Sequence, residues 1–465
     1  MTATGPMSPI LDRTRRLRAS ASGALVVALF LAGLAGSQAG SSALPPIRIG
    51  AVFPLGGSAG PLAAQQALGV RIAAELVNAD GGIGGRRIQL DVRDLERGED
   101  APAVMASLRA AGASVVVGAY SSDLSIAASA AANDAGLVYW EAGAVADRLT
   151  GRGLPLVFRV GASGTNLGVN SATFAATELA PRLHTTDAGL RVAIVAAEDD
   201  YARSVADAAR RTLRAARTPI VADLGYSLTL PRWPSVMARL AAARPDVIIL
   251  ASHIPDGVAF RRAMLAGHLK VSALIGSTMA ECDPDFAGDL GADAVGIFAS
   301  DRPTAGFRPG ALGAGARATY DRFATAWAVA VGGAPAGQYG GAPAGGADAE
   351  YAITGPLIAE RATDPTEEGL SGFAAGWALL HDVLPSAANH LGDPTAIAAA
   401  ARRLDLSVGT LPNGAGLRFS SDPETLGQNE RATAVIWQWQ APRTYAFVWP
   451  AAYATGPVAF VPLAR

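Results

Sequence analysis

The hydrophobic positions of this chain follow two alternating patterns from residue 47 onward. Residues 47–53 are almost continuously apolar, which is typical of a short strand buried on both faces. Residues 61–78 instead place Leu68 and Ile72 four positions apart, on one face of a predicted helix. The glycine-rich segment 81–85 ends that helix, because glycine readily adopts the left-handed conformation found at helix C-termini.

The same alternation runs twice through the chain up to residue 300. Strand–helix alternation builds parallel sheets whose two faces are covered by helices. We therefore expect an α/β protein with two doubly wound parallel-sheet lobes. The predicted strands are 47–53, 87–94, 114–118 and 137–140 in the first round, and 191–196, 220–226, 246–251, 272–275 and 296–300 in the second.

Beyond residue 300 the pattern becomes mainly helical before it returns to strands. Residues 332–369 are rich in Gly, Ala and Pro without a repeat, so we predict a long surface loop there. Strands this late in the chain suggest that it returns to lobes already built. Helices are predicted at 313–331, 370–391 and 394–403, and β runs at 417–419, 435–440 and 445–449.

The first 43 residues have the pattern of an export signal. Four arginines between residues 13 and 18 precede an uncharged stretch whose apolar centre is far shorter than the ~20 residues that span a bilayer. We predict a signal peptide at 1–43 and a periplasmic or other extracytoplasmic location. An uncleaved membrane anchor is the alternative, and export by either the general secretory or the twin-arginine route fits. No cysteine lies nearby to carry a lipid anchor.

Composition excludes several classes of function. The formal net charge is −2, whereas a nucleic-acid-binding protein carries a basic surface. Cys282 is the only cysteine and Lys270 the only lysine, so multi-cysteine metal sites and phosphate-binding G-K-[ST] loops are excluded. The five histidines have no metal-ligand spacing. We therefore expect no metal, no cofactor and no nucleic-acid partner.

Residues suited to catalysis are few. Gly82-Ile-Gly84 resembles the start of a dinucleotide-binding loop, but it follows a predicted helix where that motif requires a strand. No G-x-S-x-G segment supplies a serine nucleophile. Asp199 and Asp200 directly precede a predicted helix, where carboxylates interact favourably with the helix dipole. The chain is therefore expected to bind a ligand and not to act as an enzyme.

A series of short motifs occurs in order along the chain. Their order and spacing resemble the branched-chain amino-acid-type solute-binding proteins of ABC importers, which are type I periplasmic binding proteins. The resemblance extends from about residue 47 to 450. The motifs are IGAVFPLGG at 49–57, GVRIAAELVN at 69–78, GGIGGRRI at 81–88, VVVGAYSS at 115–122, DDY at 199–201, PDVIIL at 245–250 and GQNERA at 427–432.

The resemblance implies a clamshell of two lobes joined by three hinge crossings, with a solute held in the cleft. Lobe 1 would comprise residues 47–160 and 301–412, with the loop 332–369 as an insertion. Lobe 2 would comprise residues 161–300 and 413–465. The implied partners are a small-molecule solute and an inner-membrane ABC permease, and the chain itself is expected to be a monomer.

The resemblance also suggests the residues that contact the solute. Ser122, with Ser121 beside it, matches the serine that meets the solute's carboxylate; Ala144 and Val145 match an Ala-Thr pair, and Tyr201 matches an aromatic residue of the second lobe. The sequence itself supports Ser122, because a residue between a buried strand and a helix lies where open α/β sheets bind ligands. A helix N-terminus also offers unpaired N–H groups to an anion. The alternative is that Ser122 only caps its helix.

Three positions depart from the family pattern and leave the solute open. Val145 lacks the hydroxyl of the family's threonine, and Thr278 stands where amino-acid binders place an acidic residue against the solute's ammonium. Glu141 replaces a small residue, and a buried carboxylate needs a cation or strong donors. It is either the partner of a cationic or donor-rich solute or the partner of a nearby arginine. Trp140 beside it either lines the pocket or packs in the core, and core packing is the favoured interpretation.

These observations together predict an extracytoplasmic binding protein of an ABC importer. It would capture a small polar solute (an amino acid, an amide or a related carboxylate) by closure of its lobes. The alternative is a ligand-sensing ectodomain or receptor partner with the same fold. An extracytoplasmic hydrolase or amidase would require a nucleophile–base pair, and the sequence shows none.

Overall fold

The computed structural model describes residues 44–57, 59–278, 284–303, 309–332, 365–441 and 444–463. The predicted signal peptide and nearly all of the predicted loop at 332–369 lie outside the described residues. The predicted end of that segment at residue 369 is wrong, because helix α13 begins at Glu367. None of the described helices combines the length and apolar character needed to cross a membrane.

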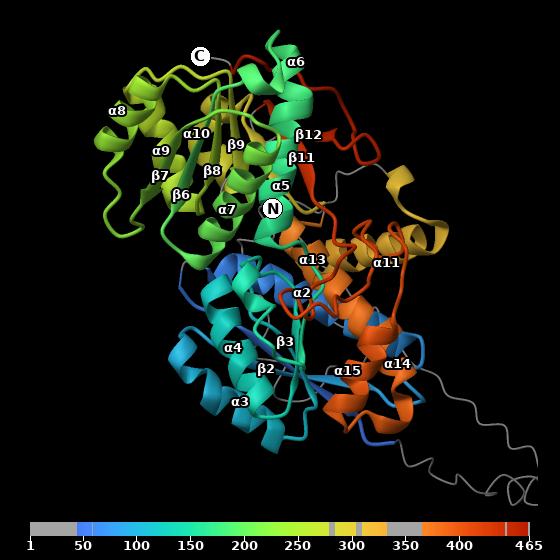
Figure 1. Cartoon of the computed structure of the whole chain (residues 1–465). Coiled ribbons are helices and arrows are strands. Elements are labelled where there is room, and N and C mark those ends of the chain that lie inside the picture. Colours follow the sequence, from blue (N-terminus) through green and yellow to red (C-terminus); the bar gives the residue numbers. More distant parts are fainter. Residues whose placement is uncertain are drawn as a thin grey trace, which may run out of the picture. The chain divides into compact units, whose positions relative to one another are not determined.

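The first sheet consists of five parallel strands in the order β2-β1-β3-β4-β5. Two of them, β2 and β3, are labelled in Figure 1. Every residue of β3 and β4 is buried, which explains why these strands appear in the sequence as continuous apolar runs. The register pairs Ile47 with Ile88 and Gly50 with Val116. The strands are β1 (Ile47–Phe53), β2 (Ile88–Asp94), β3 (Val115–Gly118), β4 (Val138–Glu141) and β5 (Val157–Arg159).

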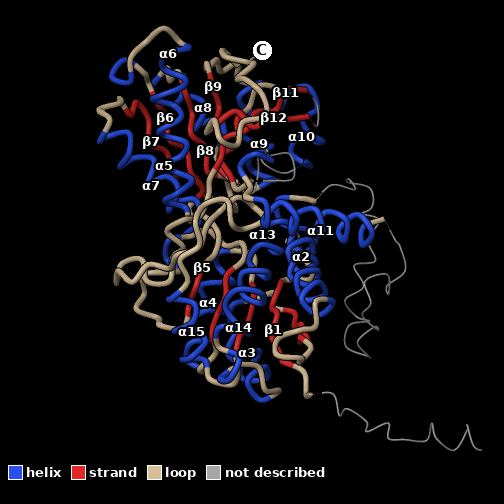
Figure 2. The backbone as a smooth tube through the Cα atoms, turned by 90° about the vertical axis from the view of Figure 1, so that its right-hand side faces the viewer, coloured by secondary structure: helices blue, strands red, loops and turns tan. Residues whose placement is uncertain are grey.

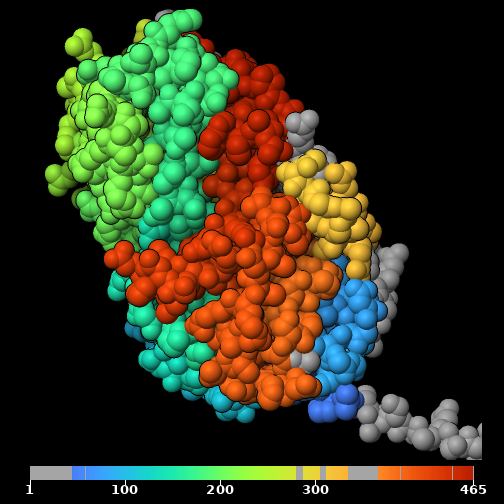
Figure 3. All heavy atoms as spheres, turned by 45° about the vertical axis from the view of Figure 1, so that its right-hand side comes forward, coloured from blue at the N-terminus to red at the C-terminus, as the bar shows by residue number. Residues whose placement is uncertain are grey.

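Helices from both ends of the chain cover this sheet. Helix α2 packs closely on α13, and Figure 3 shows the orange surface of the late helices beside the blue surface of the N-terminal part. The contact requires glycine, because a Cβ on Gly69 would come within 2.1 Å of the Gly369 carbonyl oxygen. The helices are α2 (Gly60–Ala79), α3 (Ala101–Ala110), α4 (Ser122–Asp134), α11 (Ala314–Val331), α13 (Glu367–Trp377), α14 (Leu384–Ser386) and α15 (Pro394–Arg403).

The second sheet has seven strands in the order β12-β11-β10-β9-β8-β6-β7. Its first five strands along the chain are parallel. At its edge β11 pairs antiparallel with β10, and β12 pairs antiparallel with β11, so the sheet is mixed where parallel sheets were predicted. The strands are β6 (Val192–Ala197), β7 (Ile220–Tyr226), β8 (Val247–Ala251), β9 (Ala273–Ser277), β10 (Phe298–Asp301), β11 (Val435–Ala441) and β12 (Thr444–Trp449).

Helices also cover the second sheet, as Figure 2 shows. A capping box between Ser163 and Asn166 begins α5, which continues through a π-helical turn, Ala175–Leu179, into α6. Helix α5 packs along α7. The helices are α5 (Gly164–Phe174), α6 (Ala180–Arg182), α7 (Asp200–Ala215), α8 (Trp233–Ala243), α9 (Ile254–Ala266) and α10 (Pro284–Leu290).

The late segment between α15 and β11 is largely irregular. The strand predicted at 417–419 is wrong, because Leu417 and Phe419 form only isolated bridges, to Leu406 and Asn429. Phe419 packs edge-on against Trp140 of the first sheet, with ring centroids 5.3 Å apart. The α/β fold with two sheets is confirmed. The division of the chain into two lobes remains a prediction. The contact of Phe419 with Trp140 of the first sheet favours a second lobe whose late part begins after residue 413.

Candidate functional site

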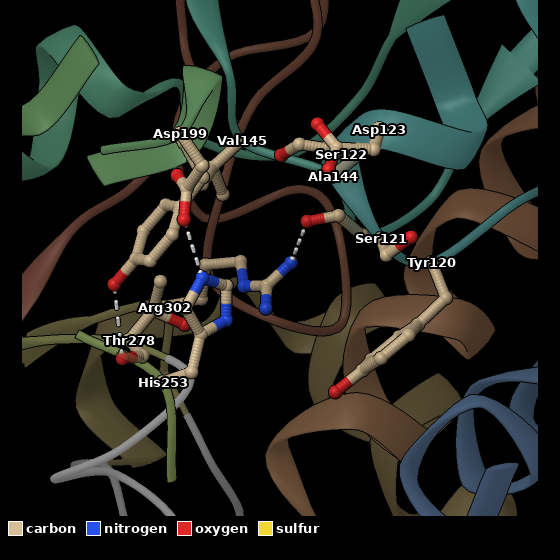
Figure 4. Close-up of a pocket in the computed structure, with 12 residues that line it drawn as sticks. Tyr120, Ser121, Ser122, Asp123, Ala144, Val145, Asp199, His253, Thr278 and Arg302 are labelled. Carbon is tan, nitrogen blue, oxygen red and sulfur yellow. Dashed lines mark hydrogen bonds and ion pairs between the residues drawn. The ribbon is translucent and has the colours of Figure 1, made fainter. Parts of the chain in front are cut away.

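A pocket lies where strands of both sheets end. Its lining comes from the segments after β3 and β4 of the first sheet and after β6, β8, β9 and β10 of the second. Open α/β sheets bind ligands at the carboxyl ends of their strands. The pocket is lined by Tyr120, Ser121, Ser122, Asp123, Gly143, Ala144, Val145, Asp199, Tyr201, His253, Thr278 and Arg302 (Figure 4).

Helix α4 begins at this pocket. Ser121 is its N-cap residue, with an extended backbone (φ −83°, ψ 149°), and the Ser121 side chain makes no capping hydrogen bond. The Ser122 hydroxyl oxygen accepts a hydrogen bond from the backbone N–H of Ala146, 3.1 Å away. The alternative role of Ser122 as a helix cap is therefore wrong. The N–H groups of the first turn have no side-chain cap and, with the helix dipole, favour an anion at the pocket.

A sharp bend between β3 and α4 places these residues. Gly118 has φ +152° and Tyr120 φ +77°, the second a conformation that non-glycine residues rarely adopt. A Cβ on Gly118 would lie 2.0 Å from the Val52 carbonyl oxygen, so the position requires glycine. The Ser125 hydroxyl oxygen accepts a hydrogen bond from the Ala119 N–H at 3.1 Å and holds the bend. The chain thus passes from strand to helix within a few residues.

Glu141 lies behind the pocket wall and does not line it. Its Oε1 accepts hydrogen bonds from the backbone N–H groups of Gly143, at 2.7 Å, and Ala144, at 2.8 Å, and Oε2 accepts one from the Tyr139 hydroxyl at 3.0 Å. Glu141 is fully buried, and this burial raises the pKa of its carboxyl, although hydrogen bonding with the Ser125 side chain and with these donors opposes the rise. No arginine of the described chain forms an ion pair with it. Neither of the two roles predicted for Glu141 is seen, and its carboxylate instead holds the loop that carries Ala144.

Asp199 and His253 form a hydrogen-bonded pair in the wall from the second sheet. Asp199 is the N-cap of α7 and accepts a hydrogen bond from the Ala202 N–H at 2.7 Å, as predicted for a carboxylate at a helix N-terminus. Its Oδ2 lies 2.6 Å from His253 Nε2 (Figure 4). Burial opposes both charges, but the pairing prevails: the pKa of His253 is raised and the pKa of Asp199 is lowered.

Tyr201 presents its ring to the pocket and its hydroxyl to the backbone. The hydroxyl lies within hydrogen-bonding distance of three strand-end carbonyl oxygens, those of Ser252, Ser277 and Thr278. The ring packs edge-on against the His253 ring, with centroids 5.2 Å apart. Any contact of Tyr201 with a solute would therefore come from the apolar ring.

Arg302 is a buried cation that connects loops of the two sheets. Its Nη1 donates a hydrogen bond to the Gly143 carbonyl oxygen at 2.7 Å, and its Nε lies 2.5 Å from Glu367 Oε1 and 3.6 Å from Asp301 Oδ1. Arg302 follows β10 of the second sheet, whereas Gly143 follows β4 of the first. Burial raises the pKa of Glu367 well above its ordinary value, and the charge of Arg302 opposes that rise.

Comparison with known proteins identifies the family. Residues 46–351 match the family model described as periplasmic binding protein. The chain belongs to the periplasmic binding protein family. This confirms the resemblance inferred from the sequence motifs. Separately, the described residues hold no cluster of His, Cys, Asp or Glu suited to a metal ion.

Relatives of this periplasmic binding protein extend over most of its length. It is 27% identical to Leu/Ile/Val-binding protein homolog 8 of Brucella suis, over 87% of this chain and 91% of the relative. The branched-chain amino acid transporter substrate binding protein of Streptococcus pneumoniae, in complex with isoleucine, superposes with a TM-score of 0.63 at 18% identity, covering 87% of this chain and all of that one. A solute binding protein of an R. palustris ABC transporter, in complex with benzoate, has a TM-score of 0.63 at 17% identity over 88% and 97%. These two structures share the fold.

The structure brings together most of the predicted site residues. Ser121, Ser122, Ala144, Val145, Tyr201 and Thr278 all line the pocket, whereas Glu141 does not. Trp140 packs in the core, as the favoured interpretation had it, and its Nε1 donates a hydrogen bond to the Ala375 carbonyl oxygen. That the lining residues contact a solute remains a prediction.

Several pocket residues were missed from the sequence. Tyr120, Asp123 and His253 each lie just after a predicted strand, so their place at a strand's carboxyl end was the available signal. Asp199 was identified only as a helix-terminal charge. Arg302 follows the last predicted strand of the second round, but a single arginine in a connecting segment gives no pattern.

Proposed function

We propose that this periplasmic binding protein serves an ABC importer and captures a small polar solute bearing a carboxylate or amide. The main supporting observation is that strand-end residues from both sheets converge on one pocket in which the N-terminus of α4 has no side-chain cap. Uncapped N–H groups and the Ser122 hydroxyl would bind the solute's oxygens. The rings of Tyr120 and Tyr201 would cover its apolar part.

The bonding of the polar side chains favours binding over turnover. His253, a potential base, is hydrogen-bonded to Asp199 and packed against Tyr201, and no serine hydroxyl of the described chain hydrogen-bonds to it. A nucleophile and its base must lie within hydrogen-bonding reach of each other. We infer that the pocket holds its solute without reacting with it.

Closure of the two lobes around the solute accounts for contacts near the pocket. Arg148, in the loop between β4 and β5, pairs with Asp200 of α7 at 2.9 Å. The N–H of Asp147 in the same loop donates a hydrogen bond to the Ser204 hydroxyl oxygen at 2.9 Å. A solute that touches both sheets adds to these contacts only in the closed form and so shifts the population toward it. The closed form would then dock on a membrane permease.

A thermal-shift screen tests this function. The purified protein is heated with amino acids, amides, ureas and aromatic acids, including isoleucine and benzoate. A solute at 100 times its dissociation constant adds about 2.7 kcal/mol of stability, which produces a clear rise in Tm. We expect at least one compound to raise Tm in the wild type, and Ser122→Ala to abolish most of that rise.

Ser163→Ala is the matched control for this variant. Ser163 is also a serine at a helix start, where its side chain caps α5, but it does not line the pocket. Loss of that cap lowers Tm with and without solute, because it costs about 1 kcal/mol, and it leaves the solute-dependent rise intact. An unchanged rise in Ser122→Ala, or no rise with any compound, would refute the proposed function.

A further inference from the structure

The charged groups of the pocket are paired, with one exception. Asp199 is bonded to His253, and Arg302 to Glu367. Asp123 also lines the pocket, but its partly exposed carboxylate has no hydrogen-bond or ion-pair partner among the described residues. The paired groups already have partners within the protein, so Asp123 is the charged group of the described pocket lining that a solute could pair with.

The surroundings of Asp123 do not supply a partner for this charge. Asp200, the other acid nearby, is engaged by Arg148 at 2.9 Å and by Arg203 at 3.3 Å. Partial burial and the charges of Asp199 and Asp200 raise the pKa of Asp123, although His253 and Arg203 oppose the rise. The nearby acids Asp199 and Asp200 thus have cationic partners of their own, whereas the Asp123 carboxylate at the pocket would gain an ion pair from a positive group of a solute.

Asp123 directly follows Ser122 in the first turn of α4. A solute carboxylate bound at the uncapped N–H groups of this turn lies close to the Asp123 carboxylate and is repelled by it. A solute with an ammonium group beside its carboxylate avoids this repulsion. Its carboxylate meets the N–H groups of the turn, and its ammonium meets the Asp123 carboxylate. Thr278, which has no carboxylate, cannot take the role of an acidic partner from the second sheet.

We propose that Asp123 is the residue that makes this pocket select amine-bearing carboxylates over their amine-free analogues. The inference rests on the proposed function, because it assumes that a carboxylate is bound at α4. It assigns recognition of the ammonium to the first sheet, beside the residues that bind the carboxylate. Selection works both ways: Asp123 attracts the zwitterion and repels the simple anion.

Calorimetric titration of matched solute pairs tests this inference. The pairs are leucine with 4-methylpentanoate, isoleucine with 3-methylpentanoate, and phenylalanine with 3-phenylpropanoate, with benzoate as a further amine-free acid. We expect the wild type to bind the amino acid of its preferred pair at least about tenfold more tightly than the amine-free partner. Asp123→Asn, which keeps the size of the side chain, reduces that ratio by about tenfold.

Asp134→Asn is the matched control. It removes the same charge from the same helix, but Asp134 is the last residue of α4, is exposed and does not line the pocket, so the ratio stays within about threefold of the wild-type value. An amine-free acid that binds the wild type as tightly as its partner overturns the inference, as does an unchanged ratio in Asp123→Asn. In both cases solutes still bind, and the proposed function stands. If no compound binds the wild type, the proposed function fails and the inference with it.

Discussion

Substitution of Glu141 separates a structural role from a role in solute recognition. Its carboxylate is buried behind the pocket wall and accepts hydrogen bonds from the N–H groups of Gly143 and Ala144 and from the Tyr139 hydroxyl. Glu141→Ala removes all three acceptor contacts. Glu141→Gln keeps an oxygen where the two backbone N–H groups point. The two variants therefore differ in whether the loop at 142–146 keeps its support.

The expected loss of stability in Glu141→Ala follows from the number of buried donors left without an acceptor. A buried N–H that loses its acceptor costs about 1–3 kcal/mol, so two of them cost about 2–6 kcal/mol. Part of this is offset, because the raised pKa shows that burial of the Glu141 charge is itself unfavourable. We expect Glu141→Ala to lower the free energy of unfolding by about 2–4 kcal/mol and Glu141→Gln by about 1 kcal/mol or less.

Urea denaturation followed by circular dichroism measures both values. Glu99→Ala is the control, because the Glu99 side chain is 72% exposed and its loss changes stability by about 0.5 kcal/mol or less. Solute affinities should fall by one common factor for cationic and anionic compounds, since Glu141 does not line the pocket. A stable Glu141→Ala, or a selective loss of cationic solutes in Glu141→Gln, would refute the reasoning.

Three further predictions concern the pocket walls. Tyr201→Phe should keep solute affinity, measured by calorimetry, within about threefold of the wild type. It should lose about 1–2 kcal/mol of stability, because buried carbonyl oxygens lose a hydrogen-bond donor. Tyr201→Ala should abolish most of the solute-dependent rise in Tm, measured by melting curves. Arg302→Met should cost about 3–5 kcal/mol by leaving Glu367 buried without its cation, and adding Glu367→Gln should restore much of the loss in urea denaturation. NMR titration should find the imidazole pKa of His253 above its ordinary value in the wild type and lower in Asp199→Asn. The stability gained from the pair is therefore present at acidic pH and lost as pH rises through the raised pKa. Identical titrations in both proteins would contradict this.

The sequence predicts the strands well because their signal is local. Buried parallel strands such as Val247–Ala251 are apolar on both faces, and no other short element has that pattern as consistently. The direction of a strand is not a local property, so the antiparallel return of β11 could not be predicted. The short run at 417–419 failed for a related reason: its partners are single residues of irregular segments, and hydrophobicity alone does not provide a ladder.

Pocket residues were predictable where their position after a strand indicates their role. They were not predictable where their role depends on a partner that is distant in the sequence. Ser122 and Tyr201 were found because they follow strands and match family motifs. The pairing of Asp199 with His253 joins residues 54 positions apart, and only the alignment of β6 beside β8 brings them together. The orientation of Glu141 was equally hidden, because it depends on where the N–H groups of the next loop point.

The distribution of hydrogen bonds in the pocket has a consequence for solute affinity. The Tyr201 hydroxyl, the Asp199–His253 pair and Arg302 are each held by partners within the protein. Side chains already fixed in this way lose little conformational entropy on binding, so they form a rigid wall. The uncapped first turn of α4 and the Asp123 carboxylate are the polar groups left to gain new partners. Most of the selectivity among polar solutes should therefore come from this one turn, and most of the shape selection from the walls around it.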